Sequence, residues 1–259
     1  MAQRFDQYSE ISYGEGTDRP PGPAEQRALW KWEAAIGYRM FAALRWGQLG
    51  DGHITFRDPE RRDHFWMLSY GVPFRAATVH DLILIAPDGS VADGPPHATA
   101  NTAGYNIHMP LLEVRQDINS AAHTHTAFGT PWSANVEPFR AISQESCSFV
   151  FNQAIYDGED LEVDTTDGGY RIAEAMGTNT LVILRNHGLL TGGLSPAESV
   201  GWFVLAERVA EVHVKAPDGK AIGAAAARIA AATLAPESAG WRVFQWLQRS
   251  LVPDPTVVD

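Results

Sequence analysis

The sequence predicts a layered α/β sandwich built on a mainly antiparallel sheet. Short apolar runs bounded by turn residues predict strands, and longer stretches with apolar residues three or four positions apart predict helices. The two kinds of segment do not alternate strictly, which favours a layered sandwich over a doubly wound parallel sheet. With 259 residues, 45% hydrophobic and 20% charged, the chain is long enough for one sizeable core.

The first half of the chain predicts one helix followed by several strands. Residues 1–23 are polar and proline-rich and predict a flexible leader, which leaves 24–259 as a single domain. A helix is expected at 24–46, where Leu29, Trp32, Ile36 and Met40 follow helical spacing. Strands are expected at 53–57, 65–69 and 82–86, and the turn Pro-Asp-Gly after the last one is typical of tight antiparallel connections.

The second half mixes helices and strands. Predicted helices cover 101–114, 167–176, 196–215 and 221–235, and predicted strands cover 120–126 and 180–184. The run 180–184 is apolar throughout, so both of its faces are expected to be buried. An aromatic segment at 241–251 closes the chain.

Composition excludes several classes of partner. The formal net charge of −11 argues against nucleic acid, because a protein that neutralises phosphates needs clustered Lys and Arg. The start of the chain lacks a signal-peptide pattern, and no apolar stretch approaches the roughly 20 residues that span a bilayer. We therefore expect a cytoplasmic protein without a membrane partner. The single cysteine, Cys147, has no second thiol and is expected to be buried.

Three histidines predict a metal site. His123 and His125 alternate in an apolar-flanked run, so both point to one side if the run is a strand. His187 follows a second apolar run and would complete a site of three imidazoles with open coordination positions, as in catalytic metal centres. A lone His-x-His pair in an apolar strand also serves packing and hydrogen bonding, so the third histidine matters.

The motifs around these histidines resemble the class II aldolase/adducin family. They are Asn-Thr-Ala-Gly-Tyr-Asn-Ile-His at 101–108, His-Thr-His-Thr at 123–126 and Arg-Asn-His-Gly-Leu-Leu-Thr-Gly at 185–192, in the family's order. The segments at 52–57 and 74–82 are also similar, and the resemblance runs from about Arg27 to Lys215. It implies a three-layer α/β/α sandwich, a homotetramer with sites near subunit interfaces, and one divalent metal ion per subunit on the three histidines.

Two departures from the family pattern bear on the reaction. Sugar-phosphate aldolases of this family carry a metal-binding, proton-shuttling glutamate where this chain has Gly104. Their phosphate-binding Gly-Asn pair and hydroxyl residues correspond here to Gly52-His53 and Thr102-Ala103. The resemblance therefore implies an adducin-like branch with a non-phosphorylated small-molecule substrate.

The leading expectation is a carbon–carbon bond lyase, of retro-aldol or decarboxylase type, acting on a small hydroxy or oxo acid. Zinc or manganese would stabilise the enolate-like anion that both reactions share. The family-like positions nominate Glu145 first, then Tyr156 and His108, for proton transfer. A solvated or helix-starting carboxylate is the alternative for Glu145.

Substrate contacts are expected from His53, Arg185 and Trp132. Arg185 could bind a substrate carboxylate, although a structural ion pair is the alternative. Aromatic side chains near the motifs, Trp132 among them, favour an aromatic acid as substrate.

Two other functions fit the same fold. Three histidines can hold Fe(II) in an oxygenase, and a few family members that act on aromatic hydroxy acids resemble this arrangement. The third function is a non-catalytic adducin-like interaction module, which the presence of all three histidines disfavours.

Overall fold

A computed structural model describes residues 21–159, 163–235 and 238–259. Residues 1–20 of the predicted leader lie outside this description, and the first helix begins at Pro23. None of the helices in the described ranges combines the length and the apolar character needed to cross a bilayer.

One mixed sheet forms the centre of the molecule. Its strands are β1 Gly52–Arg57, β2 Phe65–Leu68, β3 Leu82–Ile85, β4 Val91–Asp93, β5 Ser120–Thr124, β6 Gln153–Tyr156, β7 Leu181–Leu184 and β8 Gly188–Gly193. They lie in the order β4-β3-β2-β1-β5-β8-β7-β6. Each neighbouring pair is antiparallel except β6 and β7, which are parallel. The prediction of a mainly antiparallel sheet is confirmed.

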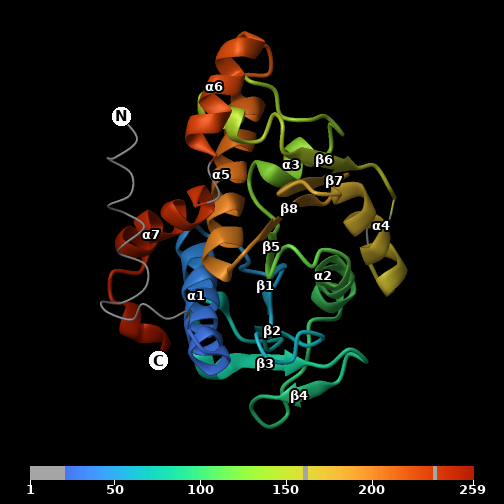
Figure 1. Ribbon diagram of the computed structural model, residues 1–259, viewed down its shortest axis with the longest axis vertical. Coiled ribbons are helices and arrows are strands. Elements are labelled where there is room, and N and C mark those ends of the chain that lie inside the picture. The colour runs from blue at the N-terminus through green and yellow to red at the C-terminus, as the bar shows by residue number, and fades with distance from the viewer. Residues whose placement is uncertain (1–20, 160–162, 236–237) are drawn as a thin grey trace.

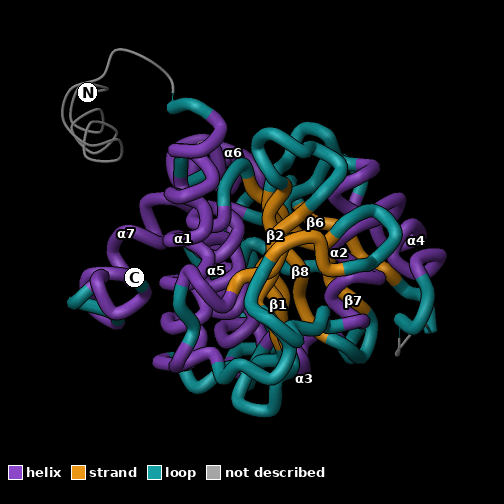
Figure 2. Tube along the Cα trace, turned by 90° about the horizontal axis from the view of Figure 1, so that it is seen from below, coloured by secondary structure: helices purple, strands orange, loops and turns teal. Residues whose placement is uncertain are grey.

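Helices cover both faces of the sheet. They are α1 Pro23–Ala43, α2 Thr102–Val114, α3 Gly129–Ser133, α4 Thr166–Met176, α5 Pro196–Lys215, α6 Ala224–Leu234 and α7 Ala239–Leu251. Figure 1 shows α1, α5 and α7 on one face and α2 and α4 on the other, and the view in Figure 2 agrees. The α/β/α sandwich is therefore confirmed.

Each face of the sheet has its own apolar core. One cluster joins α1 and α5 to the sheet and contains Phe41, Phe203 and Ala122. The other joins α2 and α4 to the opposite face and contains Ile172 and Ala121. Because side chains alternate along a strand, His123 shares the face of Ala121, on the side of α2.

Several boundaries differ from the sequence prediction. The first helix ends at Ala43 instead of residue 46 because Arg45 and Gly47 adopt the left-handed conformation, with φ of 67° and 68°. The strand predicted at 120–126 ends at Thr124, so His125 lies just beyond it. The strands β4, β6 and β8 were not predicted. The fully buried run β7 and the burial of Cys147 match expectation.

Candidate metal centre

Three histidines from separate parts of the chain converge at one end of β5. One nitrogen from each of His123, His125 and His187 lies within 4.8 Å of the others. His123 lies in β5, His125 follows the end of that strand, and His187 lies in the loop between β7 and β8. The structure thus brings together the residues nominated from the sequence, although only His123 lies within the strand.

The β7–β8 hairpin positions His187. Leu184 pairs with Gly188, so only three residues form the loop. Asn186 adopts a left-handed conformation with φ of 55°, which asparagine tolerates better than most residues. Gly188 has φ of 149°, and a Cβ atom there would lie 3.5 Å from His123 Cε1. The Asn-His-Gly sequence therefore supplies the backbone geometry that turns His187 toward the other two rings.

A hydrogen bond orients the His123 imidazole, and Asp51 lies beside the His125 imidazole. His123 Nδ1 donates to the Leu189 carbonyl oxygen at 2.7 Å, which leaves Nε2 with a lone pair. The backbone N–H of His125 donates to the Asp51 carbonyl oxygen at 3.1 Å. An Asp51 carboxylate oxygen also lies 3.9 Å from His125 Nδ1. Such neighbours of a ligand set the ring orientation and the basicity of the free nitrogen.

The protonation states suit metal binding. Burial lowers the pKa of His123 well below its ordinary value and lowers the pKa of His187 to about 4. Both rings are therefore neutral at physiological pH, as metal ligands must be. Among the described residues no carboxylate belongs to this group. Three imidazoles fit a divalent ion and leave coordination positions open.

The three histidines line a cavity of about 410 Å³, large enough for a small organic acid. Two carboxylates, Asp51 and Asp164, also line it, and sequence reasoning nominated neither. Asp51 directly precedes Gly52-His53, the pair that corresponds to the phosphate-binding Gly-Asn of the sugar-phosphate aldolases. The position of Asp164 depends on a distant contact, because the Asn106 amide donates to the carbonyl of the preceding Val163 at 2.9 Å.

His53 occupies the space beside Gly104. A Cβ atom on Gly104 would lie 2.8 Å from His53 Cδ2 and 2.9 Å from Met67 Cε, closer than side chains normally pack. His53 pairs across the sheet with His123, and the two ring centroids lie 5.3 Å apart. His53 lines the cavity, whereas His108 is fully buried behind it. An imidazole therefore fills the place from which an aldolase glutamate would project.

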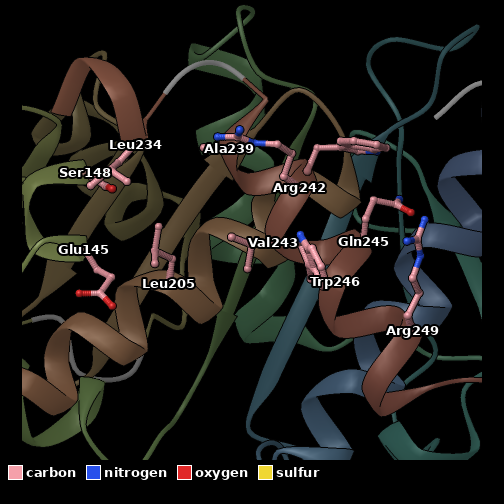
Figure 3. A pocket seen from close by; sticks show the side chains of 11 residues that line it. Glu145, Ser148, Leu205, Leu234, Ala239, Arg242, Val243, Gln245, Trp246 and Arg249 are labelled. Carbon is pink, nitrogen blue, oxygen red and sulfur yellow. The ribbon is translucent and has the colours of Figure 1, made fainter. Parts of the chain in front are cut away.

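Glu145 does not reach this cavity within one chain. It lies in a short 3₁₀ helix, Glu145–Ser148, and pairs with Arg208 at 3.3 Å. It lines a separate cavity with side chains of α7 such as Val243 and Trp246, as Figure 3 shows. The ion pair favours a structural role over the proton transfer expected from sequence position.

Three further nominated residues also lie outside the cavity lining, namely Trp132, Arg185 and Tyr156. Trp132 is 3% exposed and packs against Phe139 and His213, so it belongs to the core instead of a substrate surface.

Arg185 pairs with Asp157 and Glu159 at 3.1 and 3.2 Å, which is the structural ion pair considered as its alternative. Tyr156 is buried in the core beneath α4, where its hydroxyl accepts a hydrogen bond from Arg171 Nε at 3.3 Å. Sequence could not reveal these partners because they come from distant elements.

Comparison with known proteins identifies the family. The profile described as "Class II Aldolase and Adducin N-terminal domain" matches residues 33–214, which is most of the chain. The chain belongs to the class II aldolase and adducin family.

Two relatives within this family are 32% identical to the chain. One is "4-hydroxy-3-prenylphenylpyruvate oxygenase/4-hydroxy-3-prenylbenzoate synthase" of Streptomyces roseochromogenus subsp. oscitans, aligned over 88% of this chain and 83% of the relative. The other is "Decarboxylase NovR" of Streptomyces niveus, aligned over 90% and 87%. Among solved structures, "L-fuculose 1-phosphate aldolase from Glaciozyma antarctica PI12" superposes with a TM-score of 0.81 at 29% identity, over 91% of this chain and 96% of that one.

Proposed function

We propose that this class II aldolase family member is a divalent-metal-dependent carbon–carbon bond lyase. Its substrate would be a non-phosphorylated 2-oxo or 2-hydroxy acid that carries an aromatic ring. The observation that carries the proposal is the convergence of His123, His125 and His187 beside a cavity, without a carboxylate in their group among the described residues.

The three neutral ligands leave the charge of the ion available to the substrate. A divalent metal bound here would supply Lewis acidity for an enolate-like anion, which retro-aldol cleavage shares with decarboxylation of an acid whose carboxyl group lies β to a carbonyl. The protein orients His123 through the Leu189 carbonyl and His187 through the turn at Asn186, and the cavity beside the three imidazoles has room for a carboxylate and its adjacent oxygen. His53 lines the same cavity and would contact the acid.

Two features disfavour the sugar-phosphate aldolase reaction. Gly104 offers no carboxylate, and the His53 ring already fills the adjoining space. His53 and Ala103 stand where phosphate-binding residues would be expected, and the cavity lining includes the carboxylates of Asp51 and Asp164. Negative charges near the cavity repel a phosphate dianion more strongly than a monovalent acid.

The name of one Streptomyces relative supports an aromatic substrate, since it includes a prenylated phenylpyruvate and a prenylated benzoate. The name of the other relative, a decarboxylase, supports cleavage of a carbon–carbon bond at a carboxyl group.

A second candidate is an oxygenase that uses Fe(II) at the same three histidines. The name of the first relative includes "oxygenase", and that relative is aligned over 88% of this chain. The two candidates share every ligand and differ in the metal ion and in the need for oxygen.

An activity assay separates the two candidates. Protein loaded with Zn²⁺, Mn²⁺ or Fe²⁺ is incubated with a 4-aryl-4-hydroxy-2-oxobutanoate or with 4-hydroxymandelate, with and without oxygen, and the release of pyruvate, aromatic aldehyde and carbon dioxide and the uptake of oxygen are recorded. The lyase cleaves the 4-hydroxy-2-oxo acid into an aromatic aldehyde and pyruvate without oxygen and with zinc or manganese. Strict dependence on Fe²⁺ and oxygen would replace the lyase by the oxygenase.

We also propose that the protein assembles as a homotetramer, as the family resemblance implies. Contacts between chains of such an assembly would be expected to bury some of the exposed apolar side chains, such as Leu49, Ile229 and Trp246, each more than 60% accessible in the single chain. Sedimentation equilibrium tests this, and a monomer at micromolar concentration would contradict it.

A further inference from the structure

A buried chain of three polar side chains leads from the sheet to the histidine cavity. Thr55 Oγ1 lies 2.8 Å from His108 Nδ1, and His108 Nε2 lies 3.1 Å from His53 Nδ1. Thr55 and His108 are fully buried, and His53 is 5% exposed where it lines the cavity. The remaining ring nitrogen of His53, Nε2, makes neither of these contacts. It ends the hydrogen-bonded series on the side of the cavity, where a bound molecule can contact it.

The threonine hydroxyl sets the direction of the hydrogen bonds. Within the described part of the chain, Thr55 Oγ1 has His108 Nδ1 as its single hydrogen-bond partner. If Thr55 accepted from His108, its own buried O–H would have no acceptor, which costs more than an unused lone pair. Thr55 therefore donates to His108 Nδ1.

The direction of this hydrogen bond determines which nitrogen carries the proton in both imidazole rings. Since His108 Nδ1 accepts, the proton of this neutral ring lies on Nε2, which donates to His53 Nδ1. His53 Nδ1 accepts in turn, so the proton of His53 lies on Nε2. Burial disfavours the charged form of both rings.

Packing holds the His53 ring in this orientation. The ring lies against Gly104, whose missing side chain provides the space, and the Met67 side chain approaches the same position of Gly104. A half-turn of the ring would replace Nδ1 by carbon at the His108 contact and break the chain. His53 does not belong to the group that could hold the metal, so its Nε2 is available to the substrate.

We propose that Thr55 and His108 are positioning residues that fix His53 as the Nε2–H tautomer, so that His53 donates a hydrogen bond to an anionic oxygen of the bound acid. His53 is then a neutral donor to a carboxylate or to the enolate-like oxygen. The His53 ring lies beside Gly104, the position of the aldolase glutamate, and as a neutral N–H donor it differs from an ionised carboxylate, which only accepts. The identity of the acid rests on the proposed function, whereas the tautomer of His53 does not.

The tautomers are measured by imidazole nitrogen NMR on protein labelled with heavy-nitrogen histidine, at neutral pH and with zinc bound. Signals are assigned by comparison with His53→Gln and His108→Gln. We expect both rings as the Nε2–H tautomer, with Nδ1 unprotonated. An Nδ1–H tautomer for His53 in the wild-type protein would overturn the proposal.

Thr55→Val and Thr55→Ser form a matched pair that tests the positioning role. Valine keeps the shape of threonine but removes the hydroxyl that starts the chain, whereas serine keeps it. We expect Thr55→Val to shift the His53 signals toward the other tautomer and to weaken binding of phenylpyruvate to the zinc-loaded protein roughly tenfold. Zinc stoichiometry should stay unchanged, and Thr55→Ser should behave like wild type. Unchanged spectra and affinity in Thr55→Val would contradict the proposal.

Failure of this inference and failure of the proposed function are distinguishable. If wild-type protein binds zinc but not phenylpyruvate, the substrate class is wrong, while the spectrum still decides the His53 tautomer. If phenylpyruvate binds and His53 carries its proton on Nδ1, the substrate class stands and the positioning role fails.

Discussion

At the scale of single residues, the candidate metal centre depends on neighbours that orient its ligands. His123 is held by the Leu189 carbonyl, whereas His125 is 43% exposed at its side chain and has the Asp51 carboxylate near Nδ1. Among the described residues, Asp51 is therefore the side chain placed to influence the orientation of the exposed ligand.

We expect Asp51→Asn to weaken zinc binding about tenfold, because a carboxylate beside a ligating imidazole stabilises its orientation and raises its basicity. Competition titration with a fluorescent zinc chelator measures the change. Asp63→Asn is the matched control, since Asp63 is an exposed carboxylate beside His64, outside this cavity. An Asp51→Asn affinity equal to that of the control would show that Asp51 does not support His125.

Some site residues could be predicted from sequence and others could not. The spacing of His123 and His125 and the Asn-His-Gly turn around His187 carry local geometry, so these residues were found. The roles suggested for Glu145 and Trp132 depended on which distant elements pack against them, and Arg208 and His213 decide that in the fold. The pairing of His53 with His108 was hidden for the same reason.

At the scale of elements, glycines set how closely the helices pack. A Cβ atom on Gly169 of α4 would lie 2.0 Å from the Asn106 carbonyl oxygen of α2. A Cβ atom on Gly201 of α5 would lie 1.8 Å from the Gly240 carbonyl oxygen of α7. Both contacts are to backbone, so a side chain at either glycine must separate the helices.

We expect Gly169→Ala to lower the free energy of unfolding by about 1–3 kcal/mol through overpacking. It should also disturb the cavity, because Asn106 holds the Val163 carbonyl beside Asp164. Urea denaturation measures the stability. Gly223→Ala is the control, because Gly223 has φ of −60° and open space where the added Cβ atom would lie. Equal stability of the two variants would mean that α2 and α4 do not need the close approach.

The elements themselves were predictable where periodicity is strong. The long helices α1 and α5 follow apolar spacing, and both were expected within a few residues of their observed bounds. The strand β8 was missed because half of Gly-Leu-Leu-Thr-Gly-Gly is glycine, which is depleted in strands, and its strand conformation comes from pairing with β5 and β7 on both sides. The strands β4 and β6 are short segments at the two edges of the sheet.

At the scale of the whole molecule, burial of neutral imidazoles couples stability to pH. His108 has an ordinary pKa of 6.5 and a folded pKa of about 3. Below pH 6.5 the His108 side chain binds a proton in the unfolded state but stays neutral in the folded state. The free energy of unfolding therefore decreases as the pH decreases. For this residue the loss, relative to slightly alkaline pH, is about 2 kcal/mol at about pH 5.

We expect urea denaturation of the metal-free protein to show decreasing stability between about pH 7.5 and about pH 5. In His108→Gln that decrease should be smaller by about 2 kcal/mol. His80→Gln is the control, since His80 is exposed, and it should keep the wild-type slope. The buried neutral state assigned to His108 would be refuted by parallel pH profiles for the two variants.

The whole-molecule architecture was predictable because the family resemblance covers the histidine motifs and most of the chain. The departure at Gly104 was also visible in the sequence, but its consequence was not. Only the fold shows that an imidazole from β1 fills the space left by the missing side chain. The change from a carboxylate to a neutral donor is therefore a property of the assembled sheet and α2.

The central claim is that His123, His125 and His187 hold a divalent metal ion. Elemental analysis of anaerobically purified protein, beside His125→Ala and a His80→Ala control, tests it most directly. We predict one equivalent of zinc, manganese or iron per chain in wild type and control, and loss of that metal in folded His125→Ala. A folded wild-type protein without metal, even after incubation with these ions, would contradict the claim and favour an adducin-like interaction module.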